Sequence, residues 1–118
     1  IRVSEIVLGE LAGNAFRPIA RVGRGQDVIA VRVEAHATAA NTFEMYTIGF
    51  DFTRVGETSV ALTAPARLSG PPDALRRAAT TLVDTRDLSP GDYIVRVKLL
   101  AADGTVAGQS ARLVTIER

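Results

Sequence analysis

The sequence contains no cysteine, no tryptophan and a single histidine among its 118 residues. A chain without cysteine cannot form disulfides, thiolate nucleophiles or cysteine-ligated zinc sites. One imidazole, that of His36, cannot by itself supply a histidine triad or a histidine-rich metal site. We expect His36 to be an ordinary exposed side chain beside Glu34. The alternative is a pH-sensitive or ligand-binding role.

Aromatic residues and excess charge are also scarce. The two tyrosines, Tyr46 and Tyr93, fall on the apolar faces of their segments, which disfavours a sugar site or a single-stranded nucleic-acid platform built on exposed rings. A net charge of +1 argues against a nucleic-acid partner. No run is long and apolar enough to span a membrane. We find no catalytic constellation and expect neither enzyme activity nor a cofactor.

Polar residues cluster mainly where turns are expected. We interpret Asp84, Asp87, Asp92 and Asp103 as turn-forming residues. A weak calcium site is the alternative, although the spacing does not match an EF-hand. The stretch GRGQD at 23–27 lacks the lysine and hydroxyl residue of a phosphate loop and precedes a strand, so we expect a plain turn.

Apolar residues alternate with polar ones in several segments, which is typical of half-buried β-strands. We expect strands within 2–8, 27–37, 43–55, 59–68, 92–101 and 106–117. Pro65 marks the fourth of these as an edge or bulged strand. Asp103-Gly104 predicts a hairpin turn. The residues in apolar phase predict the core: Ile29, Val31, Val33, Ile48, Phe50, Phe52, Val95, Val97 and Leu99.

Two segments are less regular. Residues 16–22 are expected to form a short edge strand, and Asp73 is expected to cap one short helix near 73–78 that precedes a strand over 79–84. Together the pattern predicts an all-β fold, an antiparallel sandwich of about seven strands. We expect residues 1–118 to form a single β-sandwich domain, since this length suffices for a core.

The stretch LSPGDY resembles the tyrosine corner of fibronectin type III and immunoglobulin-like domains. Leu88, Pro90, Gly91 and Tyr93 occupy the positions of that motif. The resemblance implies that Tyr93 is structural. Its hydroxyl should bond a backbone group within residues 84–90.

Residues 16–18, 23–37 and 88–116 are similar to β-sandwich modules near the C-termini of bacterial von Willebrand factor A-related secreted proteins. Gly104, Gly108, Arg112 and Ile116 fit the pattern that often ends those modules. The resemblance implies a non-catalytic interaction or spacer domain of an exported bacterial protein, located outside the cell, in the periplasm or at the cell surface. The von Willebrand domain itself and its metal motif are absent from the sequence.

Two other functions stay open. The chain could be a structural subunit of an extracellular filament or surface assembly, with residues 1–16 pairing with the sheet edge of a neighbour. A small-molecule or carbohydrate binder is the third hypothesis.

The expected partner is a neighbouring protein domain or subunit. In an immunoglobulin-like topology, strands 43–55, 92–101 and 106–117 share one sheet. Ile94 and Leu100 would be apolar anchors on its outer face, and Arg96 and Lys98 would steer an acidic partner. The opposite sheet should present the solvated set Arg32, Glu34 and His36. The full outward set on the first sheet is Met45, Thr47, Ile94, Arg96, Lys98, Leu100 and Leu113.

Overall fold

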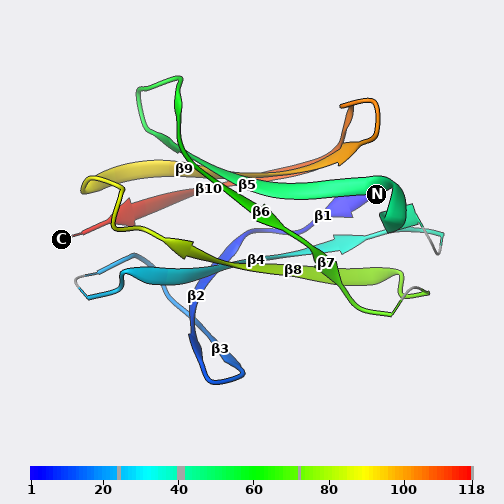
Figure 1. The fold of residues 1–118 in the computed structure, drawn as a ribbon, viewed down its shortest axis with the longest axis horizontal. Helices are drawn as coiled ribbons and strands as arrows, with labels where there is room; N and C mark the ends of the chain where they lie inside the picture. The colour runs from blue at the N-terminus through cyan, green and yellow to red at the C-terminus, as the bar shows by residue number, and fades with distance from the viewer. Residues whose placement is uncertain (24, 40–41, 72, 118) are drawn as a thin grey trace.

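Two antiparallel sheets pack face to face in the computed structural model, which describes residues 1–23, 25–39, 42–71 and 73–117. The six-stranded sheet has the order β3 (Ala15–Pro18), β2 (Val7–Ala12), β4 (Val28–His36), β8 (Arg76–Asp84) and β7 (Leu68–Ser69), and β1 (Arg2–Val3) also pairs with β4. The four-stranded sheet has the order β10 (Val106–Ile116), β9 (Gly91–Ala101), β5 (Tyr46–Arg54) and β6 (Val60–Ala66). Figure 1 shows the two layers. The predicted all-β antiparallel sandwich is therefore confirmed.

The described residues form ten strands rather than about seven because two expected strands are interrupted. Residues 4–6 separate β1 from β2, and both strands run along the same edge of β4. Arg67 separates β6 from β7 at the point where the chain crosses from one sheet to the other. The third additional strand is the short edge strand β3, which begins one residue before the expected segment and ends at Pro18.

The helix predicted near 73–78 is wrong. Asp73 lies in a turn, and β8 begins at Arg76. Nine residues of β8 pair with β4 in unbroken register, from Arg76 opposite His36 to Asp84 opposite Val28. A helix of one turn gains few backbone hydrogen bonds for its ordering cost, whereas this ladder satisfies the backbone along the whole segment.

A second correction concerns residues 43–45, which were expected to begin a strand. They belong to a 3-10 helix, η1 (Thr42–Met45), and β5 starts only at Tyr46. Met45 therefore lies outside the sheet face to which the alternation assigns it, although its side chain is exposed. The strands over 46–54, 91–101 and 106–116 do share one sheet, as predicted.

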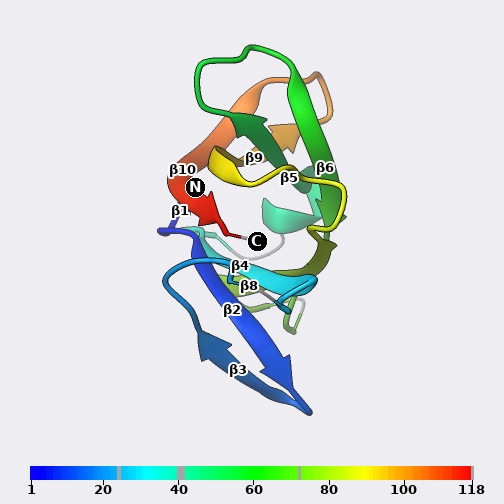
Figure 2. The same cartoon turned by 90° about the vertical axis from the view of Figure 1, so that its left-hand side faces the viewer.

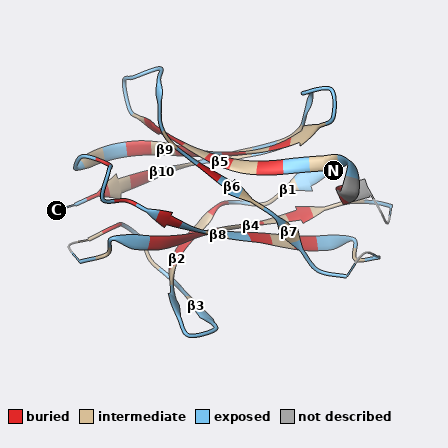
Figure 3. Cartoon of the chain, in the orientation of Figure 1, coloured by how far each residue is buried: buried red, intermediate tan, exposed pale blue. Residues whose placement is uncertain are grey.

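All nine residues of the predicted core are buried. Figure 3 shows that burial is concentrated on the strands of the two layers, while the connecting loops are exposed. Side chains from the chain ends complete the same cluster: Ile6, Leu8, Val22, Val114 and Ile116. Because alternation on facing strands brings one apolar set from each sheet into the interior, the sequence pattern was sufficient to predict this core.

The LSPGDY segment forms a hydrogen-bonded corner around Tyr93, which is only 2% exposed. The Tyr93 hydroxyl donates to the Ser89 carbonyl oxygen at 2.7 Å, within the range expected from the sequence. Arg54 lies across the ring, 5.7 Å from its centroid, and donates to the Pro90 carbonyl oxygen at 3.1 Å. Gly91 has φ +147°, and a Cβ there would lie 2.8 Å from Arg54 Nη2, so glycine permits this close approach.

Removal of the Tyr93 hydroxyl tests the corner. We expect Tyr93→Phe to lower the free energy of unfolding by about 1–3 kcal/mol, because the part-buried hydrogen bond from its hydroxyl to the Ser89 carbonyl oxygen is lost. Urea denaturation measures this difference. Tyr46→Phe is the matched control, since no hydrogen bond of its hydroxyl joins it to the described part of the chain; it should change stability by less than about 0.5 kcal/mol. Equal stability of both variants would contradict the structural role of the corner.

Truncation of a central core ring tests the packing. Phe50 is fully buried on β5, so Phe50→Ala should lower the free energy of unfolding by about 3–5 kcal/mol through lost burial and a cavity. Leu113→Ala, at a site that is 56% exposed, is the surface control and should change it by about 0.5 kcal/mol or less. The comparison requires equal denaturant slopes in both unfolding curves. Similar losses in the two variants would show that Phe50 does not anchor the core.

Candidate functional site

The outer face of the four-stranded sheet carries the residues predicted to bind a partner. Ile94 on β9 lies opposite Leu113 on β10, at one end of the strand pair. Leu100 lies opposite Val106, at the other end. Leu100 comes six positions after Ile94 on β9, which is about 20 Å along a strand. The two predicted anchors therefore belong to two separate apolar areas.

The two cations predicted to steer a partner lie between these areas. Arg96 is opposite Asp51 on β5, and Lys98 is opposite Gly49. Arg96 is exposed and Lys98 is half-buried. Because a carboxylate lies on the neighbouring strand beside Arg96, the middle of this face is mixed in charge rather than strongly positive.

The outer face of the six-stranded sheet is polar at one end. Glu34 lies between two basic side chains there: its Oε2 is 3.7 Å from His36 Nε2 and 4.0 Å from Arg76 Nε. Arg32 lies two residues before Glu34 on β4, and its Nη1 donates to the Thr80 hydroxyl at 3.4 Å. The three residues of the predicted solvated set lie on this outer face, but each is half-buried rather than exposed.

The other end of that face is apolar, which the sequence reasoning missed. We call Leu11, Phe16, Val28 and Leu82 the hairpin patch. Leu82 is 58% exposed, Val28 49% and Leu11 44%, and these three line one hollow of about 450 Å³. Phe16 lies opposite Leu11 in the register of β2 and β3. The sequence signal for this patch was a pair of consecutive apolar residues on each strand. Val28 precedes Ile29 on β4 and Leu82 precedes Val83 on β8, so both faces of these strands are apolar at this end.

Two of the patch residues, Leu11 and Phe16, lie on the β2–β3 hairpin, which extends beyond the two layers (Figure 2). Only Val7 to Gly9 of β2 pair with β4, so the rest of β2 pairs with β3 alone. Glu10 holds the hairpin near its base, because its carboxylate accepts hydrogen bonds from Arg17 and Gln26. These hydrogen bonds lower the pKa of the Glu10 carboxyl, and the one from Arg17 has the larger effect.

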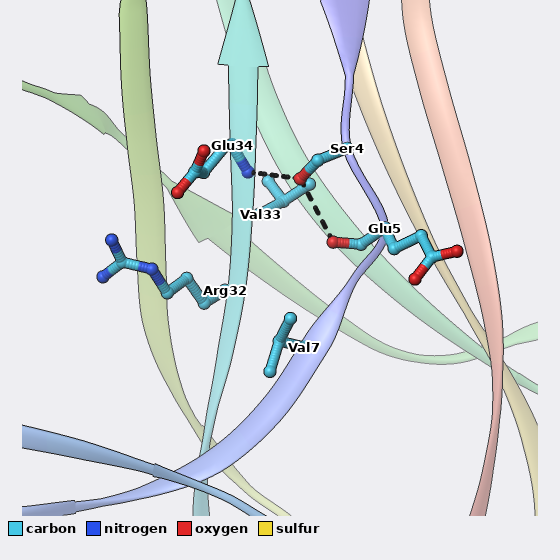
Figure 4. A pocket seen from close by; sticks show the side chains of 6 residues that line it. All are labelled: Ser4, Glu5, Val7, Arg32, Val33 and Glu34. Carbon is cyan, nitrogen blue, oxygen red and sulfur yellow. Dashed lines mark hydrogen bonds between the residues drawn. The ribbon is translucent and has the colours of Figure 1, made fainter.

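A second hollow, of about 340 Å³, lies where the chain bends between β1 and β2. Ser4 maintains the pairing across the bend: its N–H donates to the Glu34 carbonyl oxygen at 2.8 Å, and its hydroxyl accepts the Glu34 N–H at 2.8 Å. Figure 4 shows the Glu5 and Glu34 carboxylates pointing to opposite sides of this hollow. The hollow thus lacks the convergent polar groups of a small-molecule site among the residues drawn.

The aspartates near the turns take up separate local contacts. Asp84 pairs with Arg86, and the Asp92 carboxylate accepts from the Thr115 hydroxyl at 2.7 Å. The Asp103 carboxylate accepts from Thr105 in the β9–β10 turn, and these hydrogen bonds lower its pKa. Within residues 1–23, 25–39, 42–71 and 73–117 no three histidine or acidic side chains gather in a group that could hold a metal ion.

Comparison with protein families, with curated proteins and with solved structures yields no match to this chain. The structure by itself defines the class as an antiparallel two-sheet β-sandwich. In the part of the chain that is described, no helix has the length and apolar character needed to cross a membrane.

Gly9 at the base of the hairpin allows a close packing that can be tested. A Cβ at Gly9 would lie 2.5 Å from the Phe16 ring and 2.7 Å from the Arg17 carbonyl oxygen. Gly9→Ala should therefore lower the free energy of unfolding by about 1–3 kcal/mol through overpacking. It should also increase hydrogen exchange of the β2–β3 amides.

Gly49→Ala is the matched control, because a Cβ on this β5 glycine would meet its nearest atom, the Ala64 carbonyl oxygen, at an ordinary 3.7 Å. We expect it to leave exchange in the hairpin unchanged. Equal hydrogen exchange in the Gly9 variant and the parent would show that the packing of the Phe16 ring does not depend on a glycine at position 9.

Proposed function

We propose that the chain is a non-catalytic interaction domain of the immunoglobulin or fibronectin type III kind from an exported bacterial protein, which docks onto a neighbouring domain or subunit through the hairpin patch. The observation that carries this proposal is the gathering of Leu11, Val28 and Leu82 around one hollow. Aliphatic side chains exposed singly are ordinary, but a contiguous group on a monomer indicates an interface. Support for the domain type comes from the Tyr93 corner and the similarity of residues 88–116.

The surroundings of the patch resemble the polar rim of an interface. Ion pairs flank it on two sides: Arg17 with Glu10 on the hairpin, and Arg86 with Asp84 at the end of β8. A stable interface covers about 800 Å² per partner, roughly a ninth of the 6930 Å² surface of this chain. The contact must therefore extend from the four patch residues onto the hairpin and these ion pairs.

The hairpin patch is a better docking surface than the face with Ile94 and Leu100. Its exposed aliphatic side chains line one hollow, whereas the apolar residues of the other face lie at opposite ends of β9. Arg96 and Lys98 then contribute to the rate of encounter with an acidic surface rather than to the apolar contact.

A structural subunit of an extracellular assembly is the second candidate. β3 is the terminal strand of its sheet and pairs with β2 only, among the strands described. An edge strand of this kind can pair with the edge of another copy. A carbohydrate-binding role is less favoured, because Tyr93 is buried and engaged in the corner.

Matched leucines on the two sheets test the proposed surface. Leu82 and Leu113 are 58% and 56% exposed, so their replacement by glutamine is comparable in its effect on the monomer. We expect self-association, measured by sedimentation across a wide range of protein concentration, to weaken by at least about tenfold in Leu82→Gln. Leu113→Gln should associate as the parent does.

Other outcomes contradict defined parts of the proposal. Association weakened by Leu113→Gln alone would move the interface to the four-stranded sheet. A parent protein that is monomeric at every concentration would contradict docking between copies and the assembly role together. In that case, the proposal requires the Val28 and Leu82 amides to be better protected from hydrogen exchange in the full gene product than in the isolated chain. Equal protection would show that the patch is not a docking surface.

A further inference from the structure

β10 is the longest edge strand among those described, with 11 residues, and it contains no proline. The strands at the other sheet edges are shorter, and two of them, β3 and β6, contain Pro18 and Pro65. Proline lacks the N–H that an added strand needs for its ladder. An unprotected edge can pair with a further extended segment, so the free side of β10 is a candidate binding surface.

One contact of the chain with itself shows which backbone groups face this free side. The Val22 N–H donates to the Thr115 carbonyl oxygen at 3.0 Å, and the Glu117 N–H donates to the Val22 carbonyl oxygen at 2.7 Å. The backbone groups of successive residues in a strand point alternately to its two sides. The residues in phase with Thr115 therefore direct their N–H and C=O groups away from β9: Gln109, Ala111 and Leu113.

The open part of this edge is short and is bounded at both ends. Val22 occupies the C-terminal end, and β1 packs against the other end, where a Cβ at Gly108 would lie 2.8 Å from the Val3 side chain. Residues 109–113 between them span about 17 Å of strand. A hollow of about 380 Å³ lies beside this stretch, lined by Glu5, Ile6, Ala111 and Arg112. An opening of this size fits one extended segment better than the edge of a second folded copy.

The charges beside the open edge define the segment that it fits. On the outer face Lys98 lies opposite Gln109, and Arg96 lies opposite Ala111. Neither cation forms an ion pair among the residues described. Asp51 lies opposite Arg96 on the β5 side, which leaves a net positive charge here. Because Ala111 is small, the Arg96 side chain can extend across β10 toward an added strand, which would lie about 10 Å from β9.

We propose that the free edge of β10 binds an extended acidic segment of a partner protein, which adds a further strand to the four-stranded sheet. Its main-chain hydrogen bonds to Gln109, Ala111 and Leu113 provide affinity, and its side chains provide specificity. Alternate residues of a strand share a face. Acidic side chains at two alternate positions face Arg96 and Lys98, and an aliphatic side chain at the next alternate position packs on Leu113. This surface is separate from the hairpin patch, which lies on the other sheet.

Hydrogen exchange of the backbone amides, measured at constant ionic strength, tests this surface. The probe is a short peptide in which threonine alternates with glutamate, glutamate and valine, together with the same peptide in reverse order. We expect one of them to slow exchange of the Gln109, Ala111 and Leu113 amides by at least about tenfold. Ser110 and Arg112 are internal controls, because their N–H groups point to β9. The peptide that protects the edge identifies the direction of the added strand.

A matched pair of double variants tests the charge. Arg96→Gln with Lys98→Gln should weaken peptide binding by at least about tenfold, through loss of two charged contacts. Arg32→Gln with Arg76→Gln removes the same charge from the outer face of the other sheet and should leave binding unchanged. Leu82→Gln should also bind the peptide as the parent does, which separates this site from the hairpin patch.

Four outcomes would overturn the proposal. Neither peptide protects the three edge amides, a peptide with glutamine in place of glutamate binds equally well, or the double variant at Arg96 and Lys98 keeps full affinity. In the fourth, the same amides become protected without peptide as the protein concentration rises, which would show that a second copy occupies the edge.

Discussion

The packing of one inward face against the other is the interaction on which the rest of this structure depends. Phe50 and Phe52 on β5 and Val95 and Val97 on β9 supply one face, and β4 supplies the other. Fully burying an aliphatic or aromatic side chain contributes about 1.5–3 kcal/mol. Since the strand period is two, a slip of one residue would expose a whole face. The register of the central strands is therefore strongly specified, and only the edges can vary.

The hairpin patch and the crossing between the two sheets both lie where a strand leaves that specified pairing. β2 continues beyond Gly9 without β4 and carries Leu11 out on the hairpin. β6 ends and β7 begins in the other sheet, with Arg67 at the crossing. Side chains in the middle of the sheets are used in packing the core. Side chains available to a partner therefore lie at the sheet edges and crossings.

Alternation made the core and the sheet partners predictable. It failed at Arg76, where the helix expected after Asp73 competes with a long β4 ladder that only the tertiary pairing reveals. It also failed to identify the hairpin patch, because Val28 and Leu82 lie on the phase that is polar further along the same strands. The Tyr93 hydrogen bond was predictable because its acceptor, Ser89, lies only four residues away in the sequence. The contact of Arg77 with the Phe43 ring was not, because the two residues come from segments that meet only in the fold.

Two inward-facing arginines show how differently this fold can accommodate a guanidinium. Arg112 follows the inward phase of β10, and its Nη1 donates to the Ile6 carbonyl oxygen at 3.0 Å, beside the bend of the N-terminal segment. A main-chain oxygen thus satisfies part of that guanidinium, and the contact ties β10 to the opposite layer. Arg77 instead stacks on the Phe43 ring and lines an open cavity. The first arrangement is a hydrogen-bonded link between the sheets, whereas the second packs a guanidinium on an aromatic ring.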